Sequence, residues 1–89
     1  MGRYRKGRDE VTGFYVKRSD VPGTRGPMPL EHGNGYSAVR VMAQWQAEAP
    51  KDAILSILRA DFTPFRIYRY SLADDGYYGW HDHTDDALN

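Results

Sequence analysis

Residues 65–83 read FRIYRYSLADDGYYGWHDH, and this stretch decides the fold expected of the chain. Its first half is rich in aromatic residues, which is typical of a strand. Asp74-Asp75-Gly76 fits a three-residue hairpin loop with glycine in the left-handed position, and Tyr77–His83 returns as the partner strand. The stretch therefore predicts a β-hairpin in which five pairs face one another: Tyr70 with Trp80, Leu72 with Tyr78, Tyr68 with Asp82, Arg69 with His81, and Ile67 with His83. The face formed by the first three pairs is expected to be buried against helices.

Two helices are expected before this hairpin. Ser37 can cap a helix that runs to about Ala49, because apolar residues recur there at intervals of three. Pro50 or Asp52 can open a second helix that runs to about Ala60. The apolar stripe of that second helix would consist of Ile54, Leu55, Ile57 and Leu58.

The N-terminal part of the chain offers weaker signals. Residues 1–8 form a basic arm, and Val11–Val16 is expected to be a short strand. Residues 17–35 hold three prolines and four glycines without periodicity, so they predict a long loop of the kind used for binding. The whole chain, residues 1–89, is thus expected to be one α+β domain. It would have a small antiparallel sheet of about three strands, including the C-terminal hairpin, with two helices packed on one face.

Size and composition narrow the class of protein. At 89 residues the chain has room for one core, to which seven Tyr, three Phe and two Trp can contribute. The absence of cysteine excludes a disulfide scaffold and thiolate chemistry, and favours a reducing, cytoplasmic location. No apolar run is long enough to span a membrane, so no membrane partner is expected.

The net charge of zero is an average over two ends of opposite sign. Residues 1–26 carry seven Lys or Arg against three acids, whereas residues 74–89 carry five Asp and no Lys or Arg. If the ends lie apart, each can steer a partner of opposite charge. If they lie side by side, they neutralise each other.

Three patterns in the sequence are candidates for a chemical site. Gly33-Asn34-Gly35-Tyr36-Ser37-Ala38 fits G-x-G-x-x-A before a helix, but it lacks the preceding strand of a nucleotide-binding unit. His81 and His83 could share a metal ion on one strand face, but no third His or Cys lies at a typical spacing. No serine has a recognisable elbow or base. We therefore expect no catalytic residue, no cofactor and no metal.

Nucleic-acid binding is the alternative function. The basic arm supplies cations beside an aromatic residue, Tyr4, and the strand residues Arg66, Tyr68 and Tyr70 alternate on one face as a stacking platform can. A pI near 6.8 is low for a dedicated nucleic-acid binder. The arm's candidate contacts are Arg3, Arg5, Lys6 and Arg8.

The leading expectation is a non-enzymatic protein that engages a protein or nucleoprotein partner. Tyr, Trp and Arg concentrate binding energy at interfaces, and carboxylates along a strand can imitate phosphates in a basic groove. In type, the chain is similar to inhibitors of host machinery encoded by phages or mobile elements. The expected partner-binding residues are Asp74, Asp75, Tyr77, Tyr78, Trp80, Asp82 and Asp85 in the hairpin, and Arg25 in the long loop.

Overall fold

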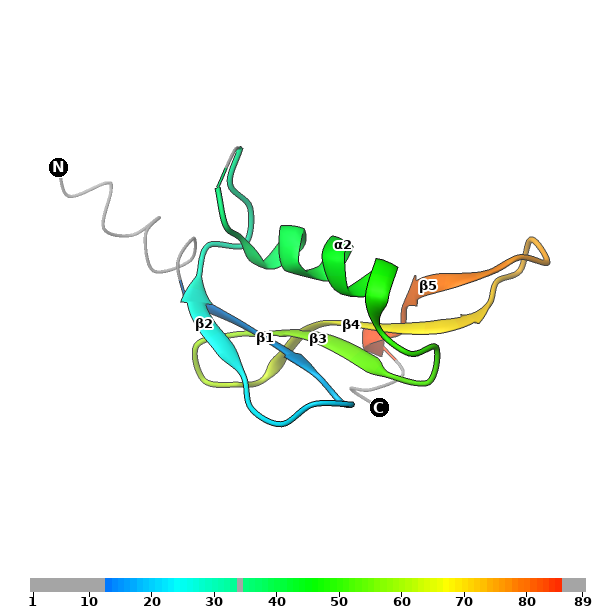
Figure 1. The fold of residues 1–89 in the computed structure, drawn as a ribbon, viewed down its shortest axis with the longest axis horizontal. Helices are drawn as coiled ribbons and strands as arrows, with labels where there is room; N and C mark the ends of the chain where they lie inside the picture. Colours follow the sequence, from blue (N-terminus) through cyan, green and yellow to red (C-terminus); the bar gives the residue numbers. More distant parts are fainter. Residues whose placement is uncertain (1–12, 34, 86–89) are drawn as a thin grey trace, which may run out of the picture.

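Five antiparallel strands and one helix form the described part of the chain, residues 13–33 and 35–85 of a computed structural model. In chain order they are β1 (Phe14–Arg18), β2 (Arg25–Met28), α2 (Ala38–Glu48), β3 (Ile54–Leu58), β4 (Pro64–Leu72) and β5 (Tyr78–Asp82). The strands lie in the order β2-β1-β3-β4-β5, and α2 crosses one face of the sheet (Figure 1). The expected fold of about three strands with two helices is therefore wrong. The predicted arm, residues 1–8, lies outside the described residues.

The predicted second helix is strand β3. Pro50 starts a turn rather than a helix, because its carbonyl accepts from Ala53 N–H at 3.0 Å. From Ala53 onward burial alternates, with Leu55 and Ile57 buried and their neighbours only half-buried. The apolar residues within Ile54–Leu58 fit the pattern of a helix stripe as well as that of a strand. The turn before it and its pairing on both sides, with β1 and β4, make it the central strand.

The predicted long loop, residues 17–35, also contains regular structure. Its start belongs to β1, and Arg25–Met28 pairs with β1 as strand β2 at the border of the sheet. Pro27 concealed this strand, because proline cannot donate to a ladder. An edge strand tolerates a proline, because one side of its backbone has no strand to bond to. The side chain of Met28, the next residue, is still buried in the core.

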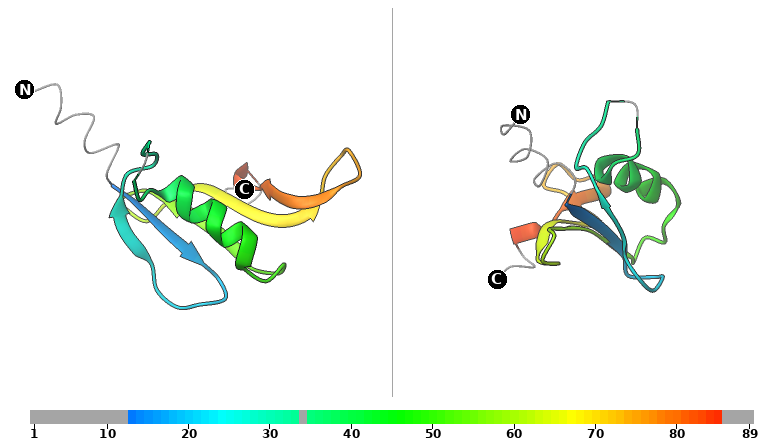
Figure 2. Two further views of the ribbon diagram at one scale, coloured as in Figure 1. Left: turned by 45° about the horizontal axis from the view of Figure 1, so that its top comes forward. Right: turned by 90° about the vertical axis from the view of Figure 1, so that its left-hand side faces the viewer.

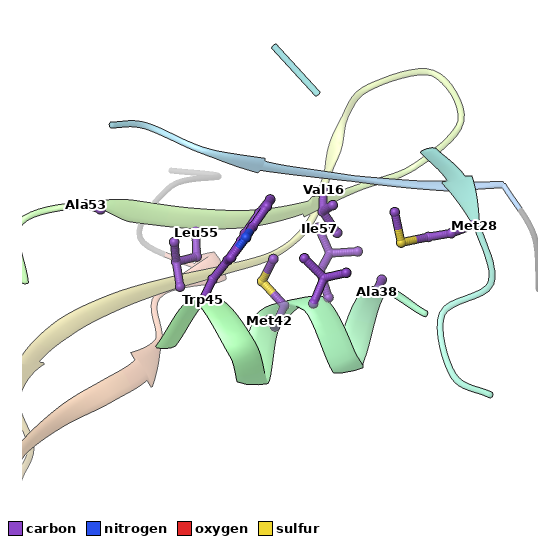
Figure 3. Close-up of a cluster of buried hydrophobic side chains, with 9 residues drawn as sticks. Val16, Met28, Ala38, Met42, Trp45, Ala53, Leu55 and Ile57 are labelled. Carbon is purple, nitrogen blue, oxygen red and sulfur yellow. The ribbon is translucent and has the colours of Figure 1, made fainter. Parts of the chain in front are cut away.

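Helix α2 begins and ends close to the prediction. Ser37 caps it, because its Oγ accepts from Arg40 N–H at 3.4 Å. One face of α2 is buried against the middle of the sheet, where Trp45 is only 4% exposed (Figure 3). No helix among the described ranges is long and apolar enough to cross a membrane. The buried apolar residues are Val16, Met28, Ala38, Val41, Met42, Trp45, Ala53, Leu55 and Ile57.

The predicted hairpin is confirmed in position and register. β4 pairs with β5 with Tyr70 opposite Trp80, and the four pairs that fall within the two strands are those expected. The fifth pair is bonded just beyond them, where His83 N–H donates to Ile67 O at 2.7 Å. Gly76 has φ +89° at the predicted loop position. The hairpin thus forms as local turn chemistry dictates.

The expected burial of one hairpin face is only partly correct. Tyr68, Tyr70 and Trp80 lie half-buried on the side of α2, but Leu72 and Tyr78 are exposed. The helix ends at Glu48, and the hairpin extends past that end (Figure 2). The outer part of the hairpin therefore lies beyond the cover that α2 provides.

Candidate functional site

The outer end of the β4–β5 hairpin, residues 72–78, exposes large apolar side chains around two carboxylates. Leu72 is 57% exposed, Tyr77 74% and Tyr78 66%. Asp74 and Asp75 lie between them in the loop and are also exposed. We call this end of the hairpin the acidic-aromatic tip. Tyr77 and Tyr78 are adjacent in an extended segment, so they point to opposite faces and offer a ring on each side.

The tip is carried on a well-ordered aromatic ladder. The Tyr70 ring stacks on Tyr78, with centroids 6.1 Å apart and planes 15° apart. It also meets the edge of Trp80, with centroids 5.6 Å apart, and Lys51 Nζ lies 4.1 Å from its centroid. The indole N–H of Trp80 donates to Gln46 O at 2.8 Å. This bond fixes the hairpin to α2, so the tip projects from a supported base.

The carboxylates of the hairpin differ in the hydrogen bonds that they accept. Asp75 Oδ1 accepts from Tyr77 N–H at 3.1 Å and so supports the loop. Asp82 accepts from both the hydroxyl and the amide of Thr84, and these bonds lower the pKa of the Asp82 carboxyl. Asp85 is exposed just beyond. The sequence contains no Lys or Arg after Arg69, so the Asp side chains are the charged groups of β5 and its loop, and Arg66 on β4 is near enough to Asp82 to help lower its pKa.

The structure does not bring Arg25 to the same site. Arg25 lies on β2, at the opposite border of the sheet from β5. Its guanidinium stacks 5.5 Å from the Trp45 ring centroid, on which Arg18 also stacks at 5.5 Å. The Arg25 side chain therefore helps to shield the core residue Trp45 from solvent. Of the predicted hairpin residues, Asp74, Asp75, Tyr77 and Tyr78 lie together at the tip. Asp82 and Asp85 lie at the other end of β5, and Trp80 serves mainly to hold the hairpin to α2.

The start of α2 is poorly suited to a phosphate. Glu31, His32 and Arg40 are among the residues around a depression of about 450 Å³ beside it. However, Ala38 N–H donates to Pro29 O at 2.9 Å and Val39 N–H to Leu30 O at 3.0 Å. With Arg40 N–H bonded to the cap, these amides are occupied. Asn34 of the G-x-G-x-x-A pattern lies outside the described residues.

The two C-terminal histidines lie on the sheet face away from α2. His81 is paired with Arg69 across the ladder, and its Nε2 is buried and has no hydrogen-bond partner within the described ranges. His83 Nε2 lies 2.8 Å from Ser71 Oγ, a serine–imidazole contact that the sequence did not predict. Within residues 13–33 and 35–85, no three His, Cys, Asp or Glu side chains gather as metal ligands.

The residues expected to bind nucleic acid do not form one surface in the described part of the chain. Tyr68 packs against the core and Tyr70 is enclosed by the aromatic ladder, so the two do not form an open stacking face. Arg66 is exposed, with its guanidinium 5.3 Å from the Phe65 centroid. Arg3, Arg5, Lys6 and Arg8 lie outside the described residues.

Comparison with known proteins adds no relative. A scan against family models, a search of curated proteins and a search of solved structures each return no match to this chain. The expected similarity in type to phage or mobile-element inhibitors thus gains no support from them.

Proposed function

We propose that this chain is a binding protein whose acidic-aromatic tip engages a basic surface of a partner protein. The observation that carries the proposal is the exposure of Leu72, Tyr77 and Tyr78 around Asp74 and Asp75, on a hairpin held to α2. Exposed rings and carboxylates suit a surface of Arg and Lys, which can stack on the rings and pair with the acids.

Charge favours a protein over a nucleic acid at this surface. Phosphates would be repelled by the acidic residues that follow Arg69 in the sequence. The apolar area of three large side chains adds a contribution that does not depend on salt. Binding should therefore weaken as salt rises but persist in part.

The test is an NMR titration with three probes of equal length: an Arg/Lys-rich peptide, its Glu counterpart and a single-stranded oligonucleotide. We expect shifts of the amides of residues 73–78 with the basic peptide alone. Asp74→Asn with Asp75→Asn keeps side-chain acceptors in the loop but removes two charges. We expect affinity to fall roughly two- to thirtyfold, because each of the two exposed ion pairs contributes about 0.2–1 kcal/mol.

The matched control removes two exposed charges elsewhere, through Glu31→Gln with Asp52→Asn. It should leave the affinity for the basic peptide unchanged. If only the oligonucleotide binds, and binding needs Arg3, Arg5, Lys6 and Arg8, the nucleic-acid alternative replaces this proposal. If the two double variants lose affinity equally, the acidic-aromatic tip is not the site.

We further propose a cytoplasmic location, which the cysteine-free sequence supports. Fractionation of cells that produce a tagged copy should recover it with a cytoplasmic marker. Recovery with a secreted or membrane marker would contradict this.

A further inference from the structure

Strand β5 is an edge strand of the sheet, and one row of its backbone groups has no strand partner among the described residues. Hydrogen-bonded pairs alternate along an antiparallel ladder. Ala73 N–H bonds to Tyr77 O at 2.9 Å and His83 N–H to Ile67 O at 2.7 Å, which fixes the phase of the ladder. With this phase, residues 77, 79, 81 and 83 bond inward to β4. The N–H and C=O groups of Tyr78, Trp80 and Asp82 therefore point outward.

The two borders of the sheet differ in how they are protected. β2 spans four residues and includes Pro27, which has no N–H, and Gly26 at φ +139°. Its pairing with β1 is also irregular. β5 has five residues, no proline, no lysine and an uninterrupted register with β4. Apart from the charge of Asp82, it has no proline, lysine or bulge to keep an edge strand from pairing with another chain.

The surroundings of β5 select the kind of strand that could be added. Asp82 and Asp85 lie at one end of β5, and Asp74 and Asp75 lie beyond the other. Between them Tyr78 exposes a ring. An added strand would thus meet acidic groups at both ends, which favours Lys or Arg in that strand. The alternating outward N–H and C=O groups match another peptide backbone but not a sugar–phosphate chain.

We propose that the outer border of β5 receives an extended basic segment of a partner protein as a sixth strand. This inference rests on the proposed function and specifies how the partner is held. Main-chain bonds to Tyr78, Trp80 and Asp82 supply affinity, and the flanking carboxylates supply the preference for a basic segment.

The probe is an acetylated nonapeptide of alternating Lys and Thr, compared with the same peptide N-methylated at alternate residues along one edge. We expect amide hydrogen exchange to slow at residues 78, 80 and 82 on binding of the first peptide. Residues 79 and 81 already bond to β4 and should change less. The N-methylated peptide should bind at least about tenfold more weakly, because several main-chain bonds are lost.

A pair of protein variants tests the border itself. Tyr78→Pro removes one outward N–H without removing a bond to β4, whereas Tyr78→Thr keeps that N–H and removes the ring. Tyr78→Pro removes one main-chain bond to the added strand, and the proline ring obstructs the edge of β5. We therefore expect Tyr78→Pro to weaken binding by about tenfold or more, and Tyr78→Thr to weaken it by less. Circular dichroism of both variants is the check that each remains folded.

The possible outcomes separate the two proposals. If the two peptides bind equally, with shifts at the acidic-aromatic tip that the Asp74→Asn, Asp75→Asn variant abolishes, strand addition is wrong and the proposed function stands. If neither peptide binds, both proposals are wrong. Protection of residues 78, 80 and 82 that grows with protein concentration alone would show that a second copy of the chain takes the border, which also overturns the inference.

Discussion

Phe62 and Gly76 occupy the same position in two hairpin loops of the same geometry. In the β3–β4 loop, Phe62 N–H donates to Arg59 O at 2.8 Å. In the β4–β5 loop, Gly76 N–H donates to Ala73 O at 3.0 Å. Both residues have positive φ, +66° for Phe62 and +89° for Gly76. Phenylalanine at this position costs backbone energy, which its tilted contact with Tyr15, at 4.7 Å between centroids, helps to offset.

The turn at Gly76 can be tested by adding a side chain where there is space for it. Gly76→Val should lower the melting temperature, because a β-branched residue at positive φ costs roughly 1 kcal/mol or more. Gly33→Val is the control, since a Cβ at either glycine meets nothing within 4 Å and only Gly76 has positive φ. Thermal unfolding followed by circular dichroism should show a clear loss for Gly76→Val alone. Equal changes in the two variants would contradict a strained backbone at Gly76.

Three carboxylates in the described residues have a lowered pKa that links stability to pH: those of Asp61, Asp82 and Asp20, the last of which is paired with Arg18. The Asp61 side chain accepts from Thr63 Oγ1 and N–H, and Asp82 accepts from Thr84 in the same way; these bonds lower the pKa of both carboxyls from 3.8. A lowered folded-state pKa stabilises the fold above the unfolded-state value, and this stability is lost as pH falls through the folded-state pKa. The melting temperature should therefore drop as the pH falls below about 4. Asp61→Asn with Asp82→Asn should make that drop smaller, and an unchanged slope would contradict the assignment.

At the scale of elements, the bond between Trp80 and Gln46 joins the hairpin to the C-terminal part of α2. Trp80→Phe removes the indole donor and leaves the Gln46 carbonyl without it. We expect a loss of about 0.5–1.5 kcal/mol, together with faster amide exchange along β5. Denaturant unfolding and hydrogen exchange measure the two effects. Tyr77→Phe, which changes an exposed ring in the tip, should cost less than about 0.5 kcal/mol, and a similar cost for both would show that Trp80 does not hold the hairpin.

The elements that the sequence predicts are those whose signals are local. Gly76 and the flanking aromatic residues define the hairpin, and Ser37 defines the start of α2. Strand β3 is missed because Ile54–Leu58 spans too few residues to separate the two periods. Of its two partners, β1 is distant in sequence, and β4 follows through a loop that lacks the usual glycine. The β3–β4 loop gave no signal, because Phe62 stands where glycine is usual. The exposure of the acidic-aromatic tip depends on where α2 ends against the sheet, which no local pattern reports.

At the scale of the whole molecule, the core and the candidate site occupy different parts of the sheet. Every fully buried apolar residue belongs to β1, β2, β3, α2 or the segment just before β3, and β4 and β5 contain none. Arg18 reinforces the core side through ion pairs with Asp20 at 2.7 Å and Glu48 at 3.0 Å. The hairpin is therefore free to carry exposed aromatic and acidic groups without exposing the core.

This division predicts a gradient of stability across the sheet. Regions with few buried apolar contacts open at lower free energy than the core. Native-state hydrogen exchange should show the largest protection in β3, which pairs on both sides and holds Leu55 and Ile57, and the smallest in β5. The inward-bonded amides of Gly79 and His81 should exchange through local opening, at a free energy well below that of global unfolding. Equal protection of β3 and β5 would show that the hairpin and the core open as one unit.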